Sequence, residues 1–275
     1  MRGQSKSSPE WLATRSILEP LLEFEPPSEL PILHLDDTFI GVHKPSGLLV
    51  HKSPLAQEAD TAALQIVRDQ IQKHLYPIHR LDRPTSGILL FALSKESAVS
   101  IYEQLSERTA VKEYWAITRG WVNEPLTIDS PLDKNQVYPA PGKEKEQKLQ
   151  EAHTEIEPVK TVELPAAVGR YETARYSWVK AFPKTGRTHQ IRRHLTRENH
   201  PILGDTRYGD GSHNQYFRDT FDCKRLLLAA KSLKFNHPGS GEALHIKCPV
   251  AEDMGNIMKQ VFRSDVLEEP CLSIS

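Results

Sequence analysis

The chain has 275 residues, of which 38% are hydrophobic and 26% are charged, with 35 Lys and Arg residues against 36 Asp and Glu residues. A chain of this length can bury a core without disulfides or metal ions, and its composition excludes an intrinsically disordered protein. The formal net charge of −1 excludes a protein that is basic over its whole surface, but it is compatible with a local basic groove.

The cysteines and the apolar runs indicate the cellular compartment of the protein. Cys223, Cys248 and Cys271 are widely spaced and contain no CxxC pair, so we expect neither a disulfide framework nor a zinc site. Free thiols are typical of a reducing compartment. The longest apolar run, Ile88–Leu93, is far shorter than the about 20 residues of a membrane span. No apolar segment of a secretory signal follows the N-terminus, so we expect a cytoplasmic protein.

Proline content divides the chain. Residues 1–31 contain five prolines and predict a poorly ordered N-terminal extension. We place the folded domain at residues 32–265 and a C-terminal tail at 266–275.

The first half of the domain shows alternating strand and helix patterns. Residues 32–35 and 39–43 predict a hairpin, Asp60 is a candidate N-cap for a helix carrying Leu64, Val67 and Ile71, and Ser94 is a candidate N-cap for the next helix. The predicted strands between and after these helices are residues 87–93 and 112–118.

The second half begins with a polar, proline-containing stretch over residues 133–170, which predicts a long loop excursion. The predicted strands after it are 176–182, 226–230, 233–235 and 243–247, with a hairpin across residues 236–241. The predicted helices are 188–197 and 254–262. Because the elements alternate without a βαβ rhythm, we expect an α+β fold.

The densest chemical signal is the segment from His79 to Gly87, with the sequence HRLDRPTSG. It places Asp82 between Arg80 and Arg83, and neighbouring cations favour an ionised carboxylate that can act as a nucleophile. The alternative interpretation is a turn with a surface ion pair of little energetic value. A kinase catalytic loop is excluded, because Leu81 interrupts the H-R-D pattern and no DFG or glycine-rich loop is present.

A second signal is the basic run from Lys184 to Arg197, which contains no acidic residue. Such a run can hold phosphates through arginine forks, or it can be a solvated basic helix face. The five-residue separation of His189 and His194 is poor for one helical face, so we expect no metal site. The basic residues concerned are Lys184, Arg187, Arg192, Arg193 and Arg197.

Two further segments have both a functional and a structural interpretation. Tyr114, in the predicted strand, is a candidate catalytic phenol or a core residue. Lys44 lies in HKPSGLLVH, a strand followed by a Pro/Gly turn, which is either a loop beside the substrate or a plain connection.

Taken together, four blocks resemble the RluA-type pseudouridine synthases and occur in that family's order. They are KPSGLLVH from Lys44, HRLDRPTSG from His79, KEYWA from Lys112 and GRTHQIRRH from Gly186. The resemblance extends from about Ile32 to Cys248. Within the family the chain is most similar to a branch that modifies uridine-65 of certain tRNAs.

The resemblance implies a mixed, largely antiparallel sheet with flanking helices and a central cleft. It implies that Asp82 is the essential aspartate, that Tyr114 is the active-site tyrosine and that Arg192 pairs with the aspartate. It implies neither metal nor cofactor. As substrate-binding residues we expect Arg80, Arg83, Lys44, Lys184, Arg187, Arg193 and Arg197.

The expected substrate is tRNA, and we expect a monomer with no obligate protein partner and no membrane association. Ribosomal RNA as the substrate, a non-catalytic RNA-binding protein on the same fold and a hydrolase with an aspartate nucleophile are the alternatives.

Overall fold

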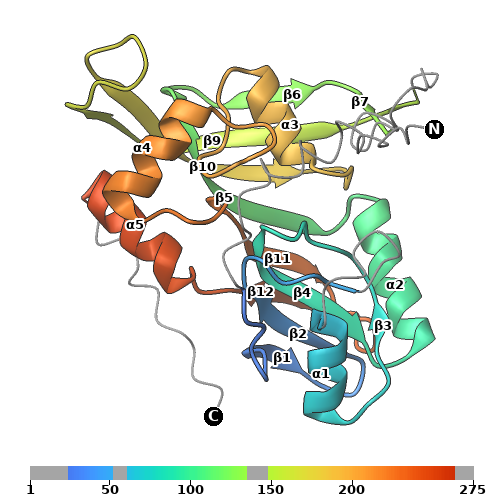
Figure 1. Ribbon diagram of the computed structural model, residues 1–275. Coiled ribbons are helices and arrows are strands. Elements are labelled where there is room, and N and C mark those ends of the chain that lie inside the picture. The colour runs from blue at the N-terminus through green and yellow to red at the C-terminus, as the bar shows by residue number, and fades with distance from the viewer. Residues whose placement is uncertain (1–23, 52–60, 135–147, 264–275) are drawn as a thin grey trace, which may run out of the picture.

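The computed structural model describes residues 24–51, 61–134 and 148–263 (Figure 1). Within these ranges the strands are β1 (Ile32–Leu35), β2 (Phe39–Lys44), β3 (Tyr76–Pro77), β4 (Ser86–Ala92), β5 (Val111–Arg119), β6 (Leu126–Asp129), β7 (Leu132–Asp133), β8 (Leu149–Gln150), β9 (His153–Leu164), β10 (Ala174–Pro183), β11 (Leu228–Asn236) and β12 (Ala243–Lys247). The helices are α1 (Ala63–Ile71), α2 (Lys95–Ser106), α3 (Gln190–Arg197), α4 (Gly211–Phe221) and α5 (Glu252–Phe262). In these parts of the chain no helix is long and apolar enough to cross a membrane.

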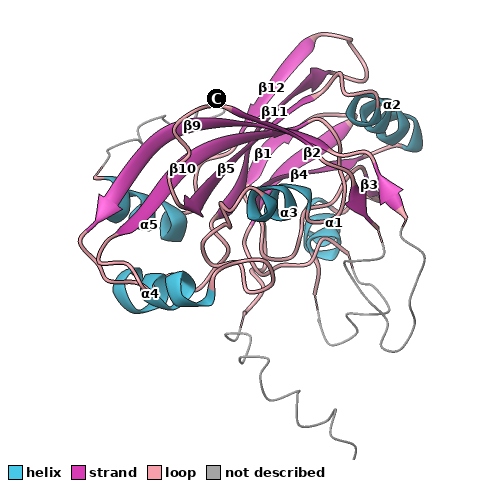
Figure 2. Cartoon of the chain, turned by 90° about the horizontal axis from the view of Figure 1, so that it is seen from above, coloured by secondary structure: helices cyan, strands magenta, loops and turns pink. Residues whose placement is uncertain are grey.

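A single mixed sheet of ten strands organises the fold (Figure 2). Its strand order is β1-β2-β4-β11-β5-β10-β9-β6, with β3 beside β4 and β12 beside β11. The pairings are antiparallel except that of β4 with β11, which is parallel. This arrangement confirms the predicted α+β class and the largely antiparallel sheet.

Helices cover both faces of the sheet because successive strand residues point to opposite sides. On β5, Ala116 packs in a cluster with residues of α3, whereas the next residue, Ile117, packs in a cluster with residues of α4 and α5. On β4, Leu89 faces the α1 cluster and Ile88 faces the α2 cluster. All seven residues of β4 are therefore buried.

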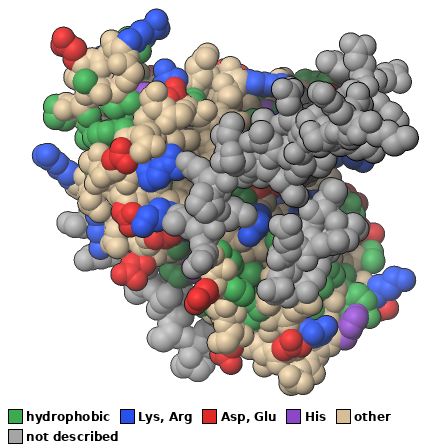
Figure 3. Space-filling model, viewed as in Figure 1, with side chains coloured by type: hydrophobic (Ala, Val, Ile, Leu, Met, Phe, Trp, Pro, Cys, Tyr) green, Lys and Arg blue, Asp and Glu red, His purple; other side chains and the backbone are tan. Residues whose placement is uncertain are grey.

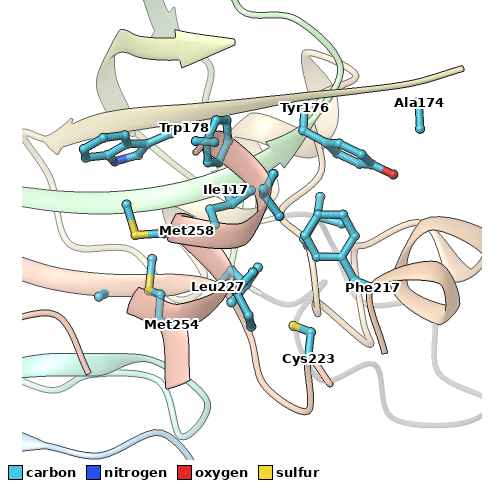
Figure 4. Close-up of a cluster of buried hydrophobic side chains, with 14 of the residues drawn as sticks. Ile117, Ala174, Tyr176, Trp178, Phe217, Cys223, Leu227, Met254 and Met258 are labelled. Atoms are coloured by element: carbon cyan, nitrogen blue, oxygen red, sulfur yellow. The ribbon is translucent and has the colours of Figure 1, made fainter. Parts of the chain in front are cut away.

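The largest aromatic cluster lies where α4 and α5 meet the sheet (Figure 4). Tyr176 and Trp178 project from β10 toward Phe217 of α4 and Met258 of α5. Tyr176 and Phe217 form an edge-to-face pair with ring centroids 4.8 Å apart, a favourable aromatic geometry. This cluster fixes α4 and α5 against the sheet.

On the outer surface of these two helices, acidic and basic side chains are interspersed (Figure 3).

Several predicted elements are confirmed. β1 and β2 form the expected hairpin, and so do β11 and β12. Ser94 caps α2, because its Oγ accepts the backbone N–H of Ser97 at 3.0 Å. The two short strands predicted between 226 and 235 are one continuous strand, β11. Helix α1 begins at Ala63 with Ala62 as its N-cap, so the prediction of a cap at Asp60 is wrong, and Asp60 itself lies outside the described residues.

The prediction of a long loop over residues 133–170 is also wrong. Twelve of these residues form β9, which pairs with β10 on one side and with β6 on the other. Thr154 and Ile156 point into the core, but Pro158 interrupts the alternation where the register with β10 shifts. The charged run at residues 143–146 lies outside the described residues.

Helix α4 has no counterpart in the sequence prediction. The carboxylate of Asp210 caps it by accepting the N–H groups of Ser212 at 3.0 Å and His213 at 3.2 Å. Of the residues in this helix only His213 and Phe217 are buried, which is too few to give an amphipathic period.

The packed part of the chain begins before the expected boundary at residue 32. Leu30 is buried, and its backbone N–H and C=O both bind the side chain of Gln70 on α1, at 3.0 and 3.1 Å. The Pro31 carbonyl accepts the N–H of His43 at 2.9 Å. Residues 24–31 therefore belong to the folded unit, and residues 1–23 and 264–275 lie outside the described ranges.

Gly87 makes the parallel contact between β4 and β11 possible. Its φ is +112°, and a Cβ at this position would overlap the backbone of Ala230 on β11. Only glycine combines this conformation with so close an approach of two backbones. Because Asp82 lies one turn before β4, this contact also determines where the carboxylate sits.

Candidate active site

A cavity of about 500 Å³ opens in the middle of the fold. It brings together Asp82, Tyr114 and Arg192, which come from three distant parts of the sequence. Asp82 precedes β4, Tyr114 lies on β5 and Arg192 lies on α3. The predicted catalytic residues therefore share one cavity.

Asp82 lies in a tight turn that two backbone hydrogen bonds hold. The Asp82 carbonyl accepts the N–H of Thr85 at 3.0 Å, and the Arg83 carbonyl accepts the N–H of Gly47 at 2.9 Å. The Arg83 side chain also donates from Nε to the Gly47 carbonyl at 2.9 Å. Arg83, expected to bind substrate, thus connects the Asp82 turn to the turn that follows β2.

Arg192 contacts two carboxylates. Its Nη1 lies 3.3 Å from Asp82 Oδ2, as the resemblance implied. Its shorter contacts are to Asp205, from Nε to Oδ2 at 2.7 Å and from Nη2 to Oδ1 at 2.8 Å. A two-pronged pair of this kind fixes the plane of the guanidinium, so Asp205 aims the remaining Nη1 at Asp82.

Asp205 was not among the expected site residues. Its side chain is completely buried, and burial alone would raise the pKa of this carboxyl. The hydrogen bonds and charge of Arg192, with the N–H groups of Tyr208 and Arg207, outweigh burial and lower the pKa. Asp205 is therefore a fixed negative charge behind Arg192. The sequence did not predict this role, because the role depends on the contact with Arg192 in the folded protein.

His189 also faces the site. Its Nε2 lies 3.9 Å from Asp82 Oδ1, and its Nδ1 lies 3.0 Å from the hydroxyl of Tyr208. Burial lowers the pKa of His189, because desolvation outweighs the attraction of Asp82. The imidazole is therefore held in its neutral form beside the carboxylate.

Tyr114 presents its phenol to the same cavity. Burial and the negative charge of Asp82 both raise the pKa of this phenol above its usual value. Tyr114 is thus a protonated, neutral aromatic group in the free protein, suited to stacking and to donating a hydrogen bond.

Gln190 holds the loop that carries the sequence GRTHQ in place. Its Oε1 accepts from Thr185 Oγ1 at 2.7 Å and from the Arg187 N–H at 2.9 Å. Its Nε2 donates to the His153 carbonyl and to Thr154 Oγ1, both at 2.9 Å. This buried amide therefore holds the loop before α3 against β9, which positions both Arg187 and Arg192.

The expected RNA-binding residues divide into two groups. Arg80 and Arg187 line the cavity, and Arg80 is exposed. The others lie elsewhere: Lys184 pairs with Glu155 at 2.7 Å, Arg193 is buried, and Arg197 donates to Ser130 Oγ and the Pro131 carbonyl.

Lys44 cannot reach an RNA molecule from where it lies. It is fully buried, and its Nζ donates to the carbonyls of Pro45 at 2.8 Å, Leu48 at 2.9 Å and Arg83 at 3.1 Å. Burial and the charge of Arg225 lower the pKa of Lys44 to about 7. The expectation of a substrate contact is therefore corrected: Lys44 fastens the turn after β2 to the Asp82 turn.

Among the described residues, three potential metal ligands meet outside the cavity. They are His34, Asp36 and His237, where the β1–β2 turn meets the β11–β12 turn. The N–H groups of Gly239 and Ser240 point at His237 Nδ1, so the proton of the neutral ring lies on Nε2 and is donated to Asp36 at 2.9 Å. This arrangement fits a hydrogen-bonded cluster and leaves no lone pair on Nε2 for a metal.

His194, from the basic run, binds Thr154 and the Ser130 carbonyl instead.

Comparison with known proteins identifies relatives along most of the chain. Residues 38–197, more than half of the chain, match the family model of RNA pseudouridylate synthase. The tRNA pseudouridine synthase C of Vibrio parahaemolyticus serotype O3:K6 (strain RIMD 2210633) is 45% identical over 226 residues, which are 82% of this chain and 92% of that protein. The protein of the same name from Haemophilus influenzae (strain ATCC 51907 / DSM 11121 / KW20 / Rd) is 44% identical over 233 residues, 84% and 97% of the two chains.

A solved structure shares the fold. The human RNA Pseudouridylate Synthase Domain Containing 1 superimposes with a TM-score of 0.62 at 26% identity, over 82% of this chain and 86% of that one.

Proposed function

Because this chain belongs to the RNA pseudouridylate synthase family, we propose that it isomerises uridine to pseudouridine in tRNA. The observation that carries the proposal is the cavity in which Arg192 Nη1 lies 3.3 Å from Asp82 and which Tyr114 also lines. The tRNA substrate is supported by the relatives named tRNA pseudouridine synthase C, which align with most of this chain.

The reaction breaks the bond between N1 of uracil and C1′ of the ribose, turns the ring and joins C5 to C1′. C5 loses a proton and N1 gains one, so the product has the same atoms as the substrate and no electron is transferred. The protein has to supply a carboxylate, a pocket that excludes water and a proton acceptor. In our proposal the residues of the cavity supply all three.

Asp82 carries out the first step, either as a nucleophile on a sugar or uracil carbon or as the base that removes the 2′ proton. Arg192 orients the carboxylate, and Asp205 orients Arg192. Tyr114 stacks on the uracil ring. His189 is the neutral imidazole nearest Asp82 and is a candidate acceptor for the C5 proton.

A uridine within a helical stem has to leave the base stack before it can enter the cavity. Arg80 is exposed at the cavity, and its guanidinium has no partner among the residues that the structure describes. We assign it to the space that the everted base vacates. Arg187, which also lines the cavity, holds the RNA backbone.

Single-turnover assays of Asp82→Asn test the catalytic role. The substrate is an unmodified tRNA transcript with tritium at C5 of uridine, and wild-type protein releases the label. The variant should bind the transcript and release no tritium. Asp129→Asn, which changes an exposed aspartate on β6, is the matched control and should behave as wild type. Product formation by Asp82→Asn would overturn the assignment.

The target nucleotide is tested in cells. We propose uridine-65 of tRNA as the target, on the resemblance of the sequence to the branch that modifies this position. Carbodiimide primer extension maps pseudouridine in RNA from a deletion strain and from the same strain complemented with this gene. A stop that depends on the gene and lies at position 65 supports the proposal. A stop only in ribosomal RNA would identify a different substrate, and no difference would indicate a non-catalytic protein.

A further inference from the structure

One ion pair at the mouth of the cavity has no part in the proposed catalytic steps. Arg108 Nη2 lies 2.7 Å from Glu151 Oε2, and both side chains are largely exposed, at 42% and 65%. Arg108 follows α2 and lines the cavity, whereas Glu151 lies between β8 and β9 on the other side. Exposed pairs of this kind contribute little to the stability of a fold, so stability does not account for the position of this one.

A second arginine reaches the same residue. Arg187 donates from Nε to the backbone carbonyl of Glu151 at 2.8 Å, and Arg187 also lines the cavity. Two guanidinium groups, one from each wall, therefore meet at residue 151. This is an arrangement that can grip one anion from two sides.

Two other cations of the cavity lining bind backbone carbonyls instead of a carboxylate. Lys112 donates to the Thr185 carbonyl at 3.1 Å, and Arg187 donates to a backbone carbonyl. Five Lys and Arg side chains line the cavity, namely Arg80, Arg108, Lys112, Arg187 and Arg192. Among the described residues, only Arg108 and the buried Arg192 of these five have a carboxylate partner.

The backbone at Arg108 is also unusual. Its φ is +66°, a left-handed conformation that glycine most often adopts after a helix. The N–H groups of Thr109 and Ala110 both return to the Gln104 carbonyl, at 3.1 Å, and hold this turn. The turn directs a long cationic side chain across the mouth of the cavity, where glycine would leave the mouth open.

We propose that Arg108 and Arg187 form a binding site for one phosphodiester of the RNA strand beside the everted nucleotide, and that the Glu151 carboxylate occupies this site in the free protein. The inference rests on the proposed function and adds a subsite to it. A phosphodiester and a carboxylate present similar oxygen pairs to a guanidinium, so the RNA replaces Glu151 as the partner of Arg108. Glu151 then turns out into solvent.

The test measures affinity for an unmodified tRNA transcript by filter binding across a salt titration. Arg108→Gln should weaken binding about tenfold and reduce the slope of log Kd against log salt by about 1, which is the loss of one phosphate contact. Glu151→Gln removes the competitor and should tighten binding about threefold. In the Arg108→Gln background, Glu151→Gln should have no effect, because the site it frees is no longer there.

Glu157→Gln is the matched control, since Glu157 is an exposed acid on β9 away from the cavity lining. It should leave Kd unchanged. Equal tightening by Glu151→Gln with and without Arg108 would reduce the effect to general charge repulsion and overturn the site. An unchanged Kd and salt slope in Arg108→Gln, or weaker binding by Glu151→Gln, would overturn it too.

Catalysis is scored separately on the same transcript. Wild-type protein that binds the transcript without forming pseudouridine would contradict the proposed function and leave the phosphate site to be judged by the binding data. Wild-type protein that forms pseudouridine, with Arg108→Gln binding as tightly, would contradict only the phosphate site. A wild-type protein that does not bind the transcript would overturn both.

Discussion

Arg192 and Asp205 form a two-pronged, buried ion pair, with nitrogen–oxygen distances of 2.7 and 2.8 Å, directly behind the Asp82 carboxylate. Both side chains are almost inaccessible to water, so neither charge can be solvated if the other is removed. The pair is therefore a requirement of the fold as well as the device that orients Arg192 toward Asp82.

Asp205→Asn should destabilise the protein by about 3 kcal/mol, because it leaves the Arg192 charge with only its longer contact to Asp82. Urea unfolding measures the loss. Glu163→Gln, which breaks an exposed pair with Arg175, is the control and should change the free energy of unfolding far less than Asp205→Asn does. Equal effects of the two substitutions would show that the burial of the Asp205 pair is energetically unimportant.

The same variant should alter the acid stability of the protein. Asp205 has a lowered pKa in the folded state, so its stabilising contribution is present above the pKa of the unfolded carboxyl and is lost as the pH falls through the folded pKa. Unfolding free energies measured at decreasing pH should therefore fall less steeply for Asp205→Asn than for wild type. Parallel curves would contradict this account.

The buried surroundings of His79 predict a second, smaller pH dependence of the free energy of unfolding. Burial and the nearby charge of Lys112 lower its pKa to about 4, and its Nε2 accepts the N–H of Leu90 at 3.1 Å. Between the unfolded value near 6.5 and about 4, the unfolded chain binds the proton and the folded protein does not, so stability declines as the pH falls.

His79→Gln keeps an acceptor for Leu90 and should reduce this decline by on the order of 2 kcal/mol. His74→Gln, at an exposed histidine, should leave it unchanged. A decline of wild-type size in His79→Gln would assign the proton uptake to other groups. The first of these is the half-buried His43, whose pKa is lowered to about 4 by burial and by the charge of Arg225.

Lys44→Met should destabilise the protein by about 3 kcal/mol, since three backbone carbonyls lose their donor. Its RNA binding, measured under conditions where the variant is folded, should keep the wild-type salt slope, because Lys44 contacts no phosphate. Arg187→Ala is the comparison and should reduce that slope. A reduced slope for Lys44→Met would restore the original expectation of an RNA contact.

Tyr114→Phe tests whether the phenol acts in its neutral form. Because burial and Asp82 raise its pKa, the group stays protonated from about pH 6 to about pH 9. The ratio of wild-type to variant single-turnover rates should therefore be constant over this range. A ratio that rises with pH would show that the phenolate is the active species.

The sequence alone identified residues that the structure brings together in one cavity, but it missed residues that hold them in place. Asp82, Tyr114 and Arg192 stand in distinctive blocks, and the structure brings them together in one cavity. The roles of Asp205 and Arg108 were not predicted, because these roles depend on which residues the fold places beside the two side chains. Lys44 illustrates the reverse error, in which a cation next to a Pro/Gly turn suggests a surface contact that burial excludes.

The prediction of the secondary structure from the sequence has the same limits. The hairpins and the Ser94 cap follow from local turn and capping chemistry, which a sequence reveals directly. β9 was missed because Pro158 and its exposed charged residues obscure the alternation, and because its pairing with β10 and β6 is a tertiary property. α4 was missed because two buried residues are enough to hold it once the sheet is present.

The distribution of charge between the bottom of the cavity and its entrance has a consequence for selectivity. At the bottom, the formal charges of Asp82, Asp205 and Arg192 add up to −1, from two carboxylates and one guanidinium. Burial keeps His189 neutral there. Arginines stand at the entrance. The phosphates of an RNA strand are attracted to the entrance and repelled from the bottom of the cavity. An uncharged nucleobase can therefore enter the cavity while the phosphates of its strand stay at the entrance. Depth of penetration thereby sorts nucleobase from backbone before any bond is broken.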